Sequence, residues 1–329
     1  MIYQELKNQL ATNRLIRYLY FSVKRIVVKL KIILELFRRN MAVSLEHYYS
    51  PIPAIRDIKN GDFNYVPTDI SAVDLQSDKQ LVLLDKLVQF YREIPFHDKK
   101  TQGMRYYFNN GYYSYMDGIF LYCMLRYLCP INVVEIGSGF SSSLILDTNE
   151  LFFGNKINCF FIEPFSARLK SLIKTNEKHN TKIYETSLQS VPLELFQQLK
   201  EGDILFIDST HVSKYNSDVN YIFHKILPAI ADGVYIHFHD IFYPFEYPKK
   251  WLLDGTSWNE QYILRAFLEY NERFEIVLFN TYLLKIFGEK LKEHFPLIYK
   301  TPGGFDMNKE FITGGSIWIK KIPKKKNGT

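Results

Sequence analysis

Short apolar runs alternate with helical stretches from residue 130 onward, and this alternation restricts the fold more than any other feature of the chain. Such runs, each followed by an amphipathic stretch, are typical of β-α-β units, whose strands pair in parallel. Five units followed by two late strands predict a doubly wound α/β fold. The predicted strands are 132–137, 158–163, 182–186, 203–208, 233–240, 274–282 and 316–322, and the predicted helices are 141–153, 165–176, 192–200, 216–231 and 258–270.

The predicted sheet is a Rossmann-like sheet of seven strands, in which the last strand runs antiparallel as a hairpin partner. The composition is that of a globular protein, because 47% of the 329 residues are hydrophobic and 23% are charged. These values exclude a disordered chain and a collagen-like fibre. The three cysteines are an odd number without metal-ligand spacing, so we expect Cys123, Cys129 and Cys159 to be reduced core residues.

The sequence divides into four predicted parts. Residues 1–40 form a helical extension, residues 41–130 form an N-terminal cap with an aromatic loop, residues 131–322 form the α/β domain, and residues 323–329 form a basic tail. The cap is predicted from a proline-bearing connector at 47–53, helical stretches at 81–92 and 116–128, and a tyrosine-rich loop at 105–115.

Basic residues are concentrated at the two ends of the chain. The net charge is +6, but residues 1–40 contain nine lysines and arginines against two glutamates, and residues 320–329 contain five lysines. The middle of the chain is therefore acidic. A nucleic-acid-binding domain carries its positive patch on the folded face, so this distribution argues against a nucleic-acid partner. The basic ends fit an anionic membrane surface better.

The segment 1–40 has the pattern of a basic amphipathic helix. No run of about 20 apolar residues exists, so no part of the chain is predicted to span a bilayer, and the charges within the apolar part argue against a cleaved signal peptide. Two interpretations stay open: packing on the domain or on a second copy in a homo-oligomer, and peripheral attachment of a cytoplasmic protein to the inner face of the membrane. The apolar face contains Leu15, Leu19, Val23, Ile26, Leu30, Ile33 and Phe37.

A glycine loop follows the first predicted strand. Gly137 and Gly139 allow a tight turn and a close approach of a ligand, and the next helix offers free N–H groups. A dinucleotide-binding loop would have a third glycine where Ser142 stands, and it has no need of Glu135. A carboxylate at position 135 suits a ligand with a cationic amino-acid part, such as the ammonium group of S-adenosylmethionine.

The next two strand ends carry residues that suit a nucleoside. Glu163, at the end of the second strand, can accept hydrogen bonds from both ribose hydroxyls of a nicotinamide or an adenosylmethionine ligand. Ser187, Leu188 and Gln189 follow the third strand, where they would border the adenine ring.

Carboxylates and imidazoles follow the fourth and fifth strands. Asp208 and His211 lie at one strand end, and His239 and Asp240 lie at the next, so we expect them to meet at one edge of the sheet. Asp208, His239 and Asp240 are candidate ligands of a divalent cation, either Mg²⁺ or, because of the imidazole, Mn²⁺, Fe²⁺ or Zn²⁺. Without a metal they would orient His211 and the acceptor. His237 lies deeper in its strand and is predicted to be a core residue.

These motifs resemble those of the class I S-adenosylmethionine-dependent methyltransferases. Within that class the chain is most similar to the bacterial branch of sugar O-methyltransferases of the macrocin and cephalosporin-tailoring type, over residues 105–320. The motifs that carry the resemblance are Glu135-Ile-Gly-Ser-Gly139, Glu163, Phe206-Ile-Asp-Ser-Thr-His211 and His237-Phe-His-Asp-Ile241.

The resemblance implies a methyltransferase domain over 131–322 and assigns roles to its site residues. In the related enzymes an Asp-x-x-His element supplies a metal ligand and the catalytic base, which corresponds to Asp208 and His211. Those enzymes carry a Glu-Asp or Asp-Asn pair where this chain has His239 and Asp240, which leaves the metal requirement open. The implied methyl-donor pocket consists of Glu135, Gly137, Gly139, Glu163, Ser187, Leu188 and Gln189.

The expected activity is O-methylation of a hydroxyl on a saccharide or a glycan-related small molecule, with S-adenosylmethionine as donor. His211 would take the hydroxyl proton, and a Mg²⁺ or Mn²⁺ ion at Asp208 and Asp240 would lower the pKa of that hydroxyl. Residues 242–251 and 258–261 would contact the sugar or form a lid. The alternatives are a nicotinamide-dependent oxidoreductase, which predicts a glycine at 142, and a non-catalytic donor-binding or scaffold protein at a membrane surface.

Overall fold

The computed structural model describes residues 47–174, 180–301, 304–305 and 314–324, with Val23, Ile26, Val27, 29–31, Ile33 and Leu34. Residues Met1–Gly61 and Asp62–Thr329 form two compact units. The first unit contains helical residues between positions 23 and 34, and α3 (Ile55–Asn60). Of the described helices, none is long and apolar enough to cross a membrane.

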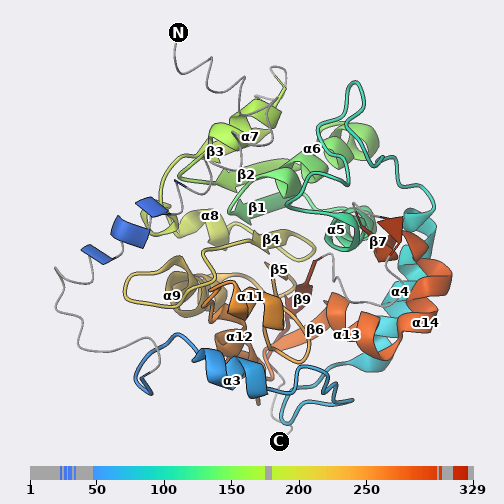
Figure 1. Ribbon diagram of the computed structural model, residues 1–329. Helices are drawn as coiled ribbons and strands as arrows, with labels where there is room; N and C mark the ends of the chain where they lie inside the picture. Colours follow the sequence, from blue (N-terminus) through green and yellow to red (C-terminus); the bar gives the residue numbers. More distant parts are fainter. Residues whose placement is uncertain are drawn as a thin grey trace, which may run out of the picture. The chain divides into compact units, whose positions relative to one another are not determined.

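The second unit is built on a seven-stranded sheet with the strand order β3-β2-β1-β4-β5-β9-β6 (Figure 1). Strands β1 to β5 run parallel, whereas β9 runs antiparallel to both β5 and β6. The predicted Rossmann-like sheet with its antiparallel last strand is therefore confirmed. The strands are β1 (Asn132–Ile136), β2 (Asn158–Ile162), β3 (Thr181–Tyr184), β4 (Ile204–Ile207), β5 (Tyr235–His239), β6 (Phe274–Phe279) and β9 (Ser316–Lys321).

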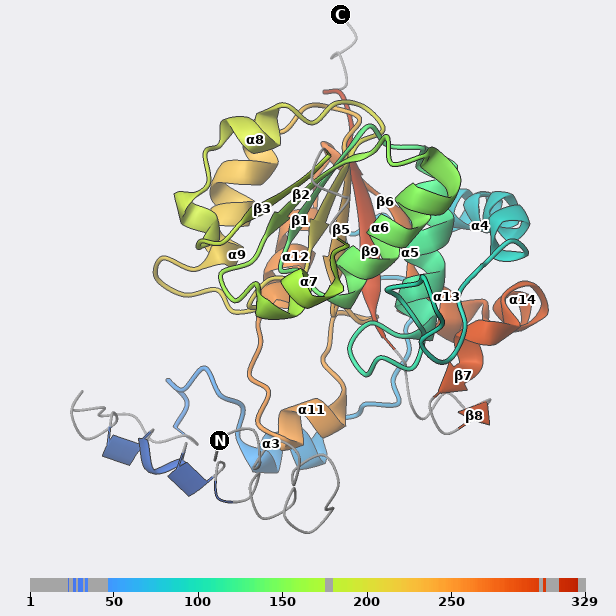
Figure 2. The same ribbon diagram turned by 90° about the horizontal axis from the view of Figure 1, so that it is seen from above.

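Helices cover both faces of this sheet. Helices α5 and α6 lie on one face, and α8, α9 and α12 lie on the other (Figure 2). The helices are α4 (Ser77–Tyr91), α5 (Tyr115–Leu128), α6 (Phe140–Phe153), α7 (Ala167–Leu172), α8 (Glu194–Gln197), α9 (Asp218–Tyr221), α10 (Leu227–Ala229), α11 (Lys249–Leu253), α12 (Glu260–Leu268), α13 (Asn280–Ile286) and α14 (Gly288–His294). Shorter elements are η1 (Leu188–Ser190), the π-helical turn η2 (Ile222–Ile226), η3 (Pro296–Tyr299), β7 (Lys300–Thr301) and β8 (Gly304–Phe305).

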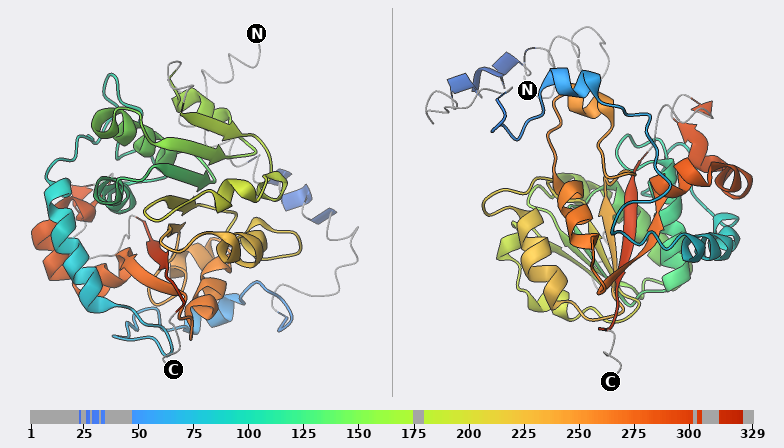
Figure 3. Two further views of the ribbon diagram at one scale, coloured as in Figure 1. Left: turned by 180° about the vertical axis from the view of Figure 1, so that it is seen from behind. Right: turned by 90° about the horizontal axis from the view of Figure 1, so that it is seen from below.

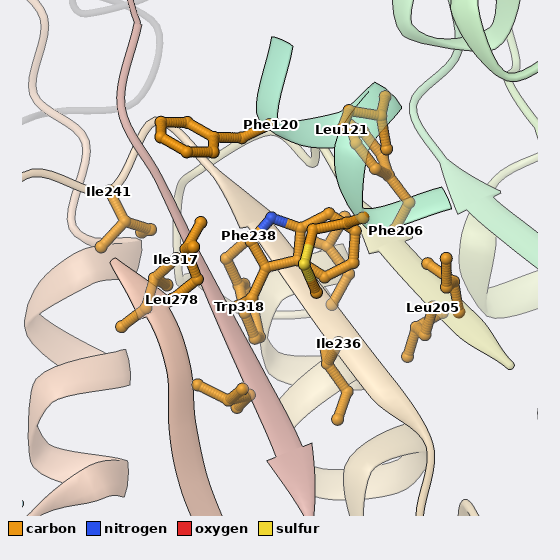
Figure 4. Packing of buried hydrophobic residues seen from close by; sticks show 14 of the residues in the cluster. Phe120, Leu121, Leu205, Phe206, Ile236, Phe238, Ile241, Leu278, Ile317 and Trp318 are labelled. Carbon is orange, nitrogen blue, oxygen red and sulfur yellow. The ribbon is translucent and has the colours of Figure 1, made fainter. Parts of the chain in front are cut away.

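The core fills the space between the sheet and α5. Phe120 and Leu121 of α5 lie over the strands beside Trp318 and Phe206 (Figure 4). All four side chains are at most 1% exposed, and each contributes about 1.5–3 kcal/mol through burial of its apolar surface. His237 stacks on the Phe206 ring, with ring centroids 4.1 Å apart, and the prediction that it is a core residue is confirmed.

Three predictions about local structure need correction. Strand β6 ends at Phe279 and α13 begins at Asn280, because the polar pair Asn280-Thr281 separates two apolar runs that the predicted strand 274–282 joined. The predicted helix 216–231 is interrupted by the π-helical turn η2. Cys129 is exposed rather than buried, because it caps the C-terminus of α5 in a left-handed conformation with φ 48°. Cys123 and Cys159 are free and buried, as predicted.

Candidate active site

The ends of β4 and β5 bring the predicted Asp/His residues together. Asp208 follows β4 directly, and its Oδ1 lies 3.3 Å from His211 Nε2 and 3.3 Å from His239 Nδ1. Asp240 follows β5, and its Oδ2 lies 3.6 Å from each of the same two nitrogens. Two carboxylates and two imidazoles therefore converge, as expected from adjacent parallel strands that end at one edge.

Each imidazole has a second carboxylate on its other nitrogen. Glu260, the first residue of α12, has its Oε2 2.8 Å from His211 Nδ1. Asp117 of α5 has its Oδ2 3.2 Å from His239 Nε2. Sequence reasoning missed Asp117, and it placed Glu260 only within the segment 258–261 that was expected to contact the sugar or form a lid. An acidic side chain within the apolar helix α5 was an available signal for Asp117, whereas the 49-residue separation of Glu260 from His211 gives no comparable signal.

The carboxylates determine the charge of this cluster. Burial lowers the pKa of His211, but its hydrogen bonds to Asp208 and Glu260 outweigh burial and raise the pKa to about 10. The pKa of His239 is likewise raised well above its usual value by Asp240 and Asp208, against the effect of burial. Burial raises the pKa of Asp240 to about 6, whereas the two imidazoles hold the pKa of Asp208 well below its usual value. The carboxylates therefore favour the protonated form of both histidines in the ligand-free site.

Two members of the cluster have strained backbones. His211 has φ 58° and Asp240 has φ 57°, in the left-handed region that residues with a side chain rarely adopt. Backbone N–H groups of Asn259 and Glu260 donate to the His211 carbonyl at 3.0 and 3.1 Å, which helps to hold that conformation. Residues with such strain are found preferentially at functional sites.

A cavity of about 330 Å³ opens beside the cluster at the ends of β1, β2 and β4. Asp208 and Ser209 line it, so the cavity and the Asp/His cluster adjoin. Its volume lies at the lower end of the range for small-molecule sites. The predicted donor residues that line the cavity are Gly137, Glu163, Ser187, Leu188 and Gln189.

Gly137 adopts a conformation that only glycine fits. Its φ is +77°, and a Cβ atom at this position would lie 1.9 Å from the backbone oxygen of Asp208. The end of β1 therefore approaches the end of β4 so closely that no side chain fits between them. Glu163 accepts backbone hydrogen bonds from Ser138 at 3.2 Å and from Phe165 at 2.7 Å, which fixes its carboxylate at the cavity wall.

Glu135 and Gly139 are not among the residues that line this cavity. Glu135 is fully buried, and it accepts hydrogen bonds from the hydroxyls of Ser141 and Ser142 in the first turn of α6. The Gly139 N–H donates to Ser142 Oγ at 3.0 Å. The predicted contacts of Glu135 and Gly139 with the donor stay predictions.

Replacing Glu135 by glutamine is expected to stabilise the ligand-free protein in a pH-dependent manner. Burial raises the pKa of Glu135 from 4.5 to about 8, so between these pH values the folded state binds the proton more tightly than the unfolded state. Stability therefore falls as the pH rises through this window. Glutamine keeps partners for both serines and cannot ionise, so we expect a melting temperature about 5 °C above wild type at pH 8. Equal melting temperatures at pH 8 would contradict the raised pKa of Glu135. A gain at pH 4.5 as large as the gain at pH 8 would contradict it as well.

The donor atoms of the cluster fit a divalent cation. Ligand atoms bound at about 2.1 Å around a tetrahedral ion lie about 3.4 Å apart, which matches the spacing of 3.3–3.6 Å between the nitrogens and the oxygens. The ligand atoms of Asp208, His211 and Asp240 lie within 4.8 Å of one another, so this set contains His211 where the predicted set contained His239. Metal-ligating histidines usually direct their second nitrogen at a carboxylate or carbonyl, as His211 and His239 do here.

An aromatic group borders the cluster on the side of α11 and α12. The Trp258 ring lies over His211, with ring centroids 4.3 Å apart, and Trp251 contacts Trp258 at 5.5 Å. Both tryptophans are only partly buried. The segment between β5 and α12, which carries α11 and both tryptophans, projects beyond the carboxyl ends of the strands (Figures 2 and 3).

Comparisons with known proteins identify the family of the chain. A sequence profile of a methyltransferase domain matches residues 134–241, which include the glycine loop and the Asp/His cluster. An uncharacterized protein of Archaeoglobus fulgidus is 33% identical over 168 residues, which make up 48% of this chain and 74% of that protein. The chain belongs to the class I S-adenosylmethionine-dependent methyltransferases.

The solved structures that resemble this chain share little sequence with it and match its fold only loosely. The O-methyltransferase TomG from Streptomyces achromogenes, involved in tomaymycin synthesis and solved with S-adenosylmethionine, has a TM-score of 0.40 and 14% identity, covering 73% of this chain and 89% of TomG. An apo structure of CmcI has a TM-score of 0.39 and 12% identity, covering 64% of this chain and 73% of CmcI.

Proposed function

We propose that this methyltransferase transfers the methyl group of S-adenosylmethionine to a hydroxyl oxygen of a saccharide or a glycan-related small molecule, with His211 as the general base. The observation that carries the proposal is the position of the His211 imidazole. It is held between Asp208 and Glu260, next to a cavity of suitable size for the donor and under the partly exposed ring of Trp258.

The donor would occupy the cavity at the ends of β1, β2 and β4. Glu163 would accept hydrogen bonds from the ribose hydroxyls, and residues 187–189 would border the adenine. The glycine loop at Gly137 lets the backbone come close to the ligand. Asp208 lines the same cavity, so a donor bound there would direct its methyl group toward the cluster.

His211 must lose its proton before it can accept one from a hydroxyl. Its pKa of about 10 results from the surrounding carboxylates, so positive charge brought into the site lowers that pKa. The sulfonium group of the donor is such a charge. A neutral imidazole at Nε2 can then take the hydroxyl proton while the oxygen attacks the methyl carbon.

Asp208, His239 and Asp240 would hold a divalent cation, with His211 nearby. Such a cation supplies positive charge that lowers the pKa of an acceptor hydroxyl. Carboxylate oxygens suit Mg²⁺, whereas the imidazole nitrogens favour Mn²⁺, Fe²⁺ or Zn²⁺.

The acceptor would lie against Trp251 and Trp258. Partly exposed aromatic rings offer a flat apolar surface on which a sugar ring can stack, and the nearby carboxylates can accept hydrogen bonds from its hydroxyls. The position of Trp258 over His211 would place a stacked sugar close to the base.

Labelled S-adenosylmethionine, offered with a panel of monosaccharides and nucleotide-linked sugars, tests the proposal. We expect methyl transfer to at least one saccharide hydroxyl. Treatment with a chelator should abolish turnover, and added Mg²⁺ or Mn²⁺ should restore it, if the cluster uses a cation. Full activity after exhaustive chelation would leave a mechanism that depends on His211 alone. Donor binding without transfer to any member of the panel would favour a non-catalytic donor-binding or scaffold protein.

We also propose that the first unit attaches the protein to an anionic membrane surface. The described helical side chains Val23, Ile26, Val27, Leu30, Ile33 and Leu34 are 44–58% exposed and recur at helical spacing. Lys29 and Lys31 of the same stretch are also exposed. Basic residues beside an exposed apolar stripe suit the interface of an anionic bilayer. The remaining residues of the predicted stripe lie outside the described part of the chain.

Deletion of residues 1–40 is expected to abolish sedimentation with phosphatidylglycerol vesicles while the protein stays folded. Each basic residue near such a surface contributes about 1 kcal/mol, so binding of the intact chain should weaken steeply as the salt concentration rises. Phosphatidylcholine vesicles serve as the control. The membrane proposal would be contradicted if the intact protein bound neither kind of vesicle and the deletion variant had a lower melting temperature or a dissociated oligomer. That result would assign the stripe to protein packing.

A further inference from the structure

We propose that Glu260 is the positioning residue of His211, a role that rests on the proposed methyltransferase function. The contacts of its carboxylate support this role. Glu260 Oε2 lies 2.8 Å from His211 Nδ1, and Glu260 Oε1 accepts a hydrogen bond from Ser209 Oγ at 2.9 Å. The Glu260 side chain is fully buried. Both oxygens are therefore held, and the carboxylate has no freedom to turn away from the imidazole.

The start of α12 also holds the backbone and the ring of His211. The N–H groups of Asn259 and Glu260 donate to the His211 carbonyl, and the Trp258 ring lies over the imidazole. Three consecutive residues thus contact His211 from one element. These contacts explain how His211 stays in its left-handed conformation, with φ 58°, in the loop that follows β4.

Glu260 also determines which nitrogen of His211 can react. Carboxylates face both ring nitrogens, but Glu260 lies 2.8 Å from Nδ1 whereas Asp208 lies 3.3 Å from Nε2. The closer contact favours the proton on Nδ1, so in the neutral imidazole the lone pair lies on Nε2. Nε2 is the nitrogen that faces Asp208 and Asp240, beside the cavity. The same logic in the serine hydrolases makes a buried acid essential for the correct tautomer of the catalytic histidine.

His239 provides an internal comparison for this assignment. Its Nε2 faces the buried carboxylate of Asp117, so Nδ1 is the nitrogen directed at Asp208 and Asp240. Glu260 and Asp117 therefore leave different ring nitrogens facing the same pair of aspartates: Nε2 of His211 and Nδ1 of His239. Of the two imidazoles, only His211 also lies beneath Trp258, on the side where we propose that the acceptor binds.

The first test observes the imidazole without any acceptor. In a ¹⁵N–¹H spectrum of the full-length protein, the Nδ1 proton of His211 should give a downfield signal that His211→Gln removes. We expect Glu260→Ala to abolish this signal and Glu260→Gln to shift it upfield. Asp203→Asn is the matched control, because Asp203 is also buried and accepts hydrogen bonds, from Ile131 and Asn132 at the opposite end of the strands. An unchanged signal in Glu260→Ala would overturn the proposal.

The second test uses methyl transfer to the best saccharide acceptor of the panel. Glu260→Ala should lower kcat about 100-fold, and Glu260→Gln, which keeps an acceptor for the Nδ1 proton, about 10-fold, with the KM for the donor unchanged. In a His211→Ala background, Glu260→Ala should cause no further loss. An equal additional loss in that background would assign Glu260 a purely structural role. Absence of transfer by the wild type would contradict the proposed function, and the spectra would still decide the role of Glu260.

Discussion

Replacing His211 by alanine is expected to lower the rate of methyl transfer by about 10²–10⁴-fold, the usual contribution of a general base. The imidazole is buried between Asp208 and Glu260, and the other imidazole of the cluster, His239, does not lie under Trp258 where we propose that the acceptor binds. Water that enters the space is a weaker base than imidazole. The measurement is kcat with labelled donor and the best saccharide acceptor.

Donor binding should not weaken in His211→Ala, because His211 is not among the residues that line the cavity and its positive charge would oppose the sulfonium group of the donor. His97→Ala is the control, since His97 is exposed and lies outside the cluster. A kcat within about threefold of wild type would contradict the assignment of His211 as base.

Replacing Gly137 by alanine is expected to abolish donor binding. The new Cβ atom would meet the Asp208 carbonyl at 1.9 Å, and the φ of +77° would cost about a further 1–2 kcal/mol. To relieve the contact, the ends of β1 and β4 must separate, which displaces both the cavity wall and Asp208. We therefore expect at least a 100-fold loss of affinity for S-adenosylhomocysteine by calorimetry, together with a lower melting temperature.

The Gly202→Ala variant separates the effect of the steric contact from the effect of the positive φ. Gly202 has a φ of +87°, but a Cβ atom there would meet nothing within 4 Å. This variant should lose folding stability because of its positive φ, as Gly137→Ala does, but it should keep its donor affinity. If Gly137→Ala binds S-adenosylhomocysteine as well as Gly202→Ala does, the close approach of β1 and β4 is not needed for the site.

The sheet could be predicted from the sequence because each strand leaves a local trace. A buried parallel strand is a short apolar run, and the turn residues around it mark where it ends. The edge at which Asp208, His211, His239 and Asp240 meet then follows from parallel pairing alone. The change from β6 to α13 falls at the polar pair Asn280-Thr281, and the predicted strand 274–282 continued across that pair because apolar residues lie on both sides of it.

The supporting residues of the site could not be predicted in the same way. The contact of Glu260 with His211 depends on how α12 packs, and the contact of Asp117 with His239 depends on the position of α5 over the sheet. Neither contact can be read from the sequence around the residues, because the partners lie far apart along the chain. The serine partners of Glu135 could not be predicted either: its place before the glycines suggested a ligand contact, which stays a prediction, and the structure adds hydrogen bonds from two serine hydroxyls to its carboxylate.

Direct binding of S-adenosylhomocysteine, measured by calorimetry on the intact chain, tests the central claim that the cavity beside Asp208 is a methyl-donor site. We predict saturable binding with one site per chain and no comparable binding of NAD. Glu163→Ala should weaken the affinity about 10- to 100-fold, because it removes hydrogen bonds between a carboxylate and the ribose. Failure to bind S-adenosylhomocysteine, or an unchanged affinity in Glu163→Ala, would contradict the account.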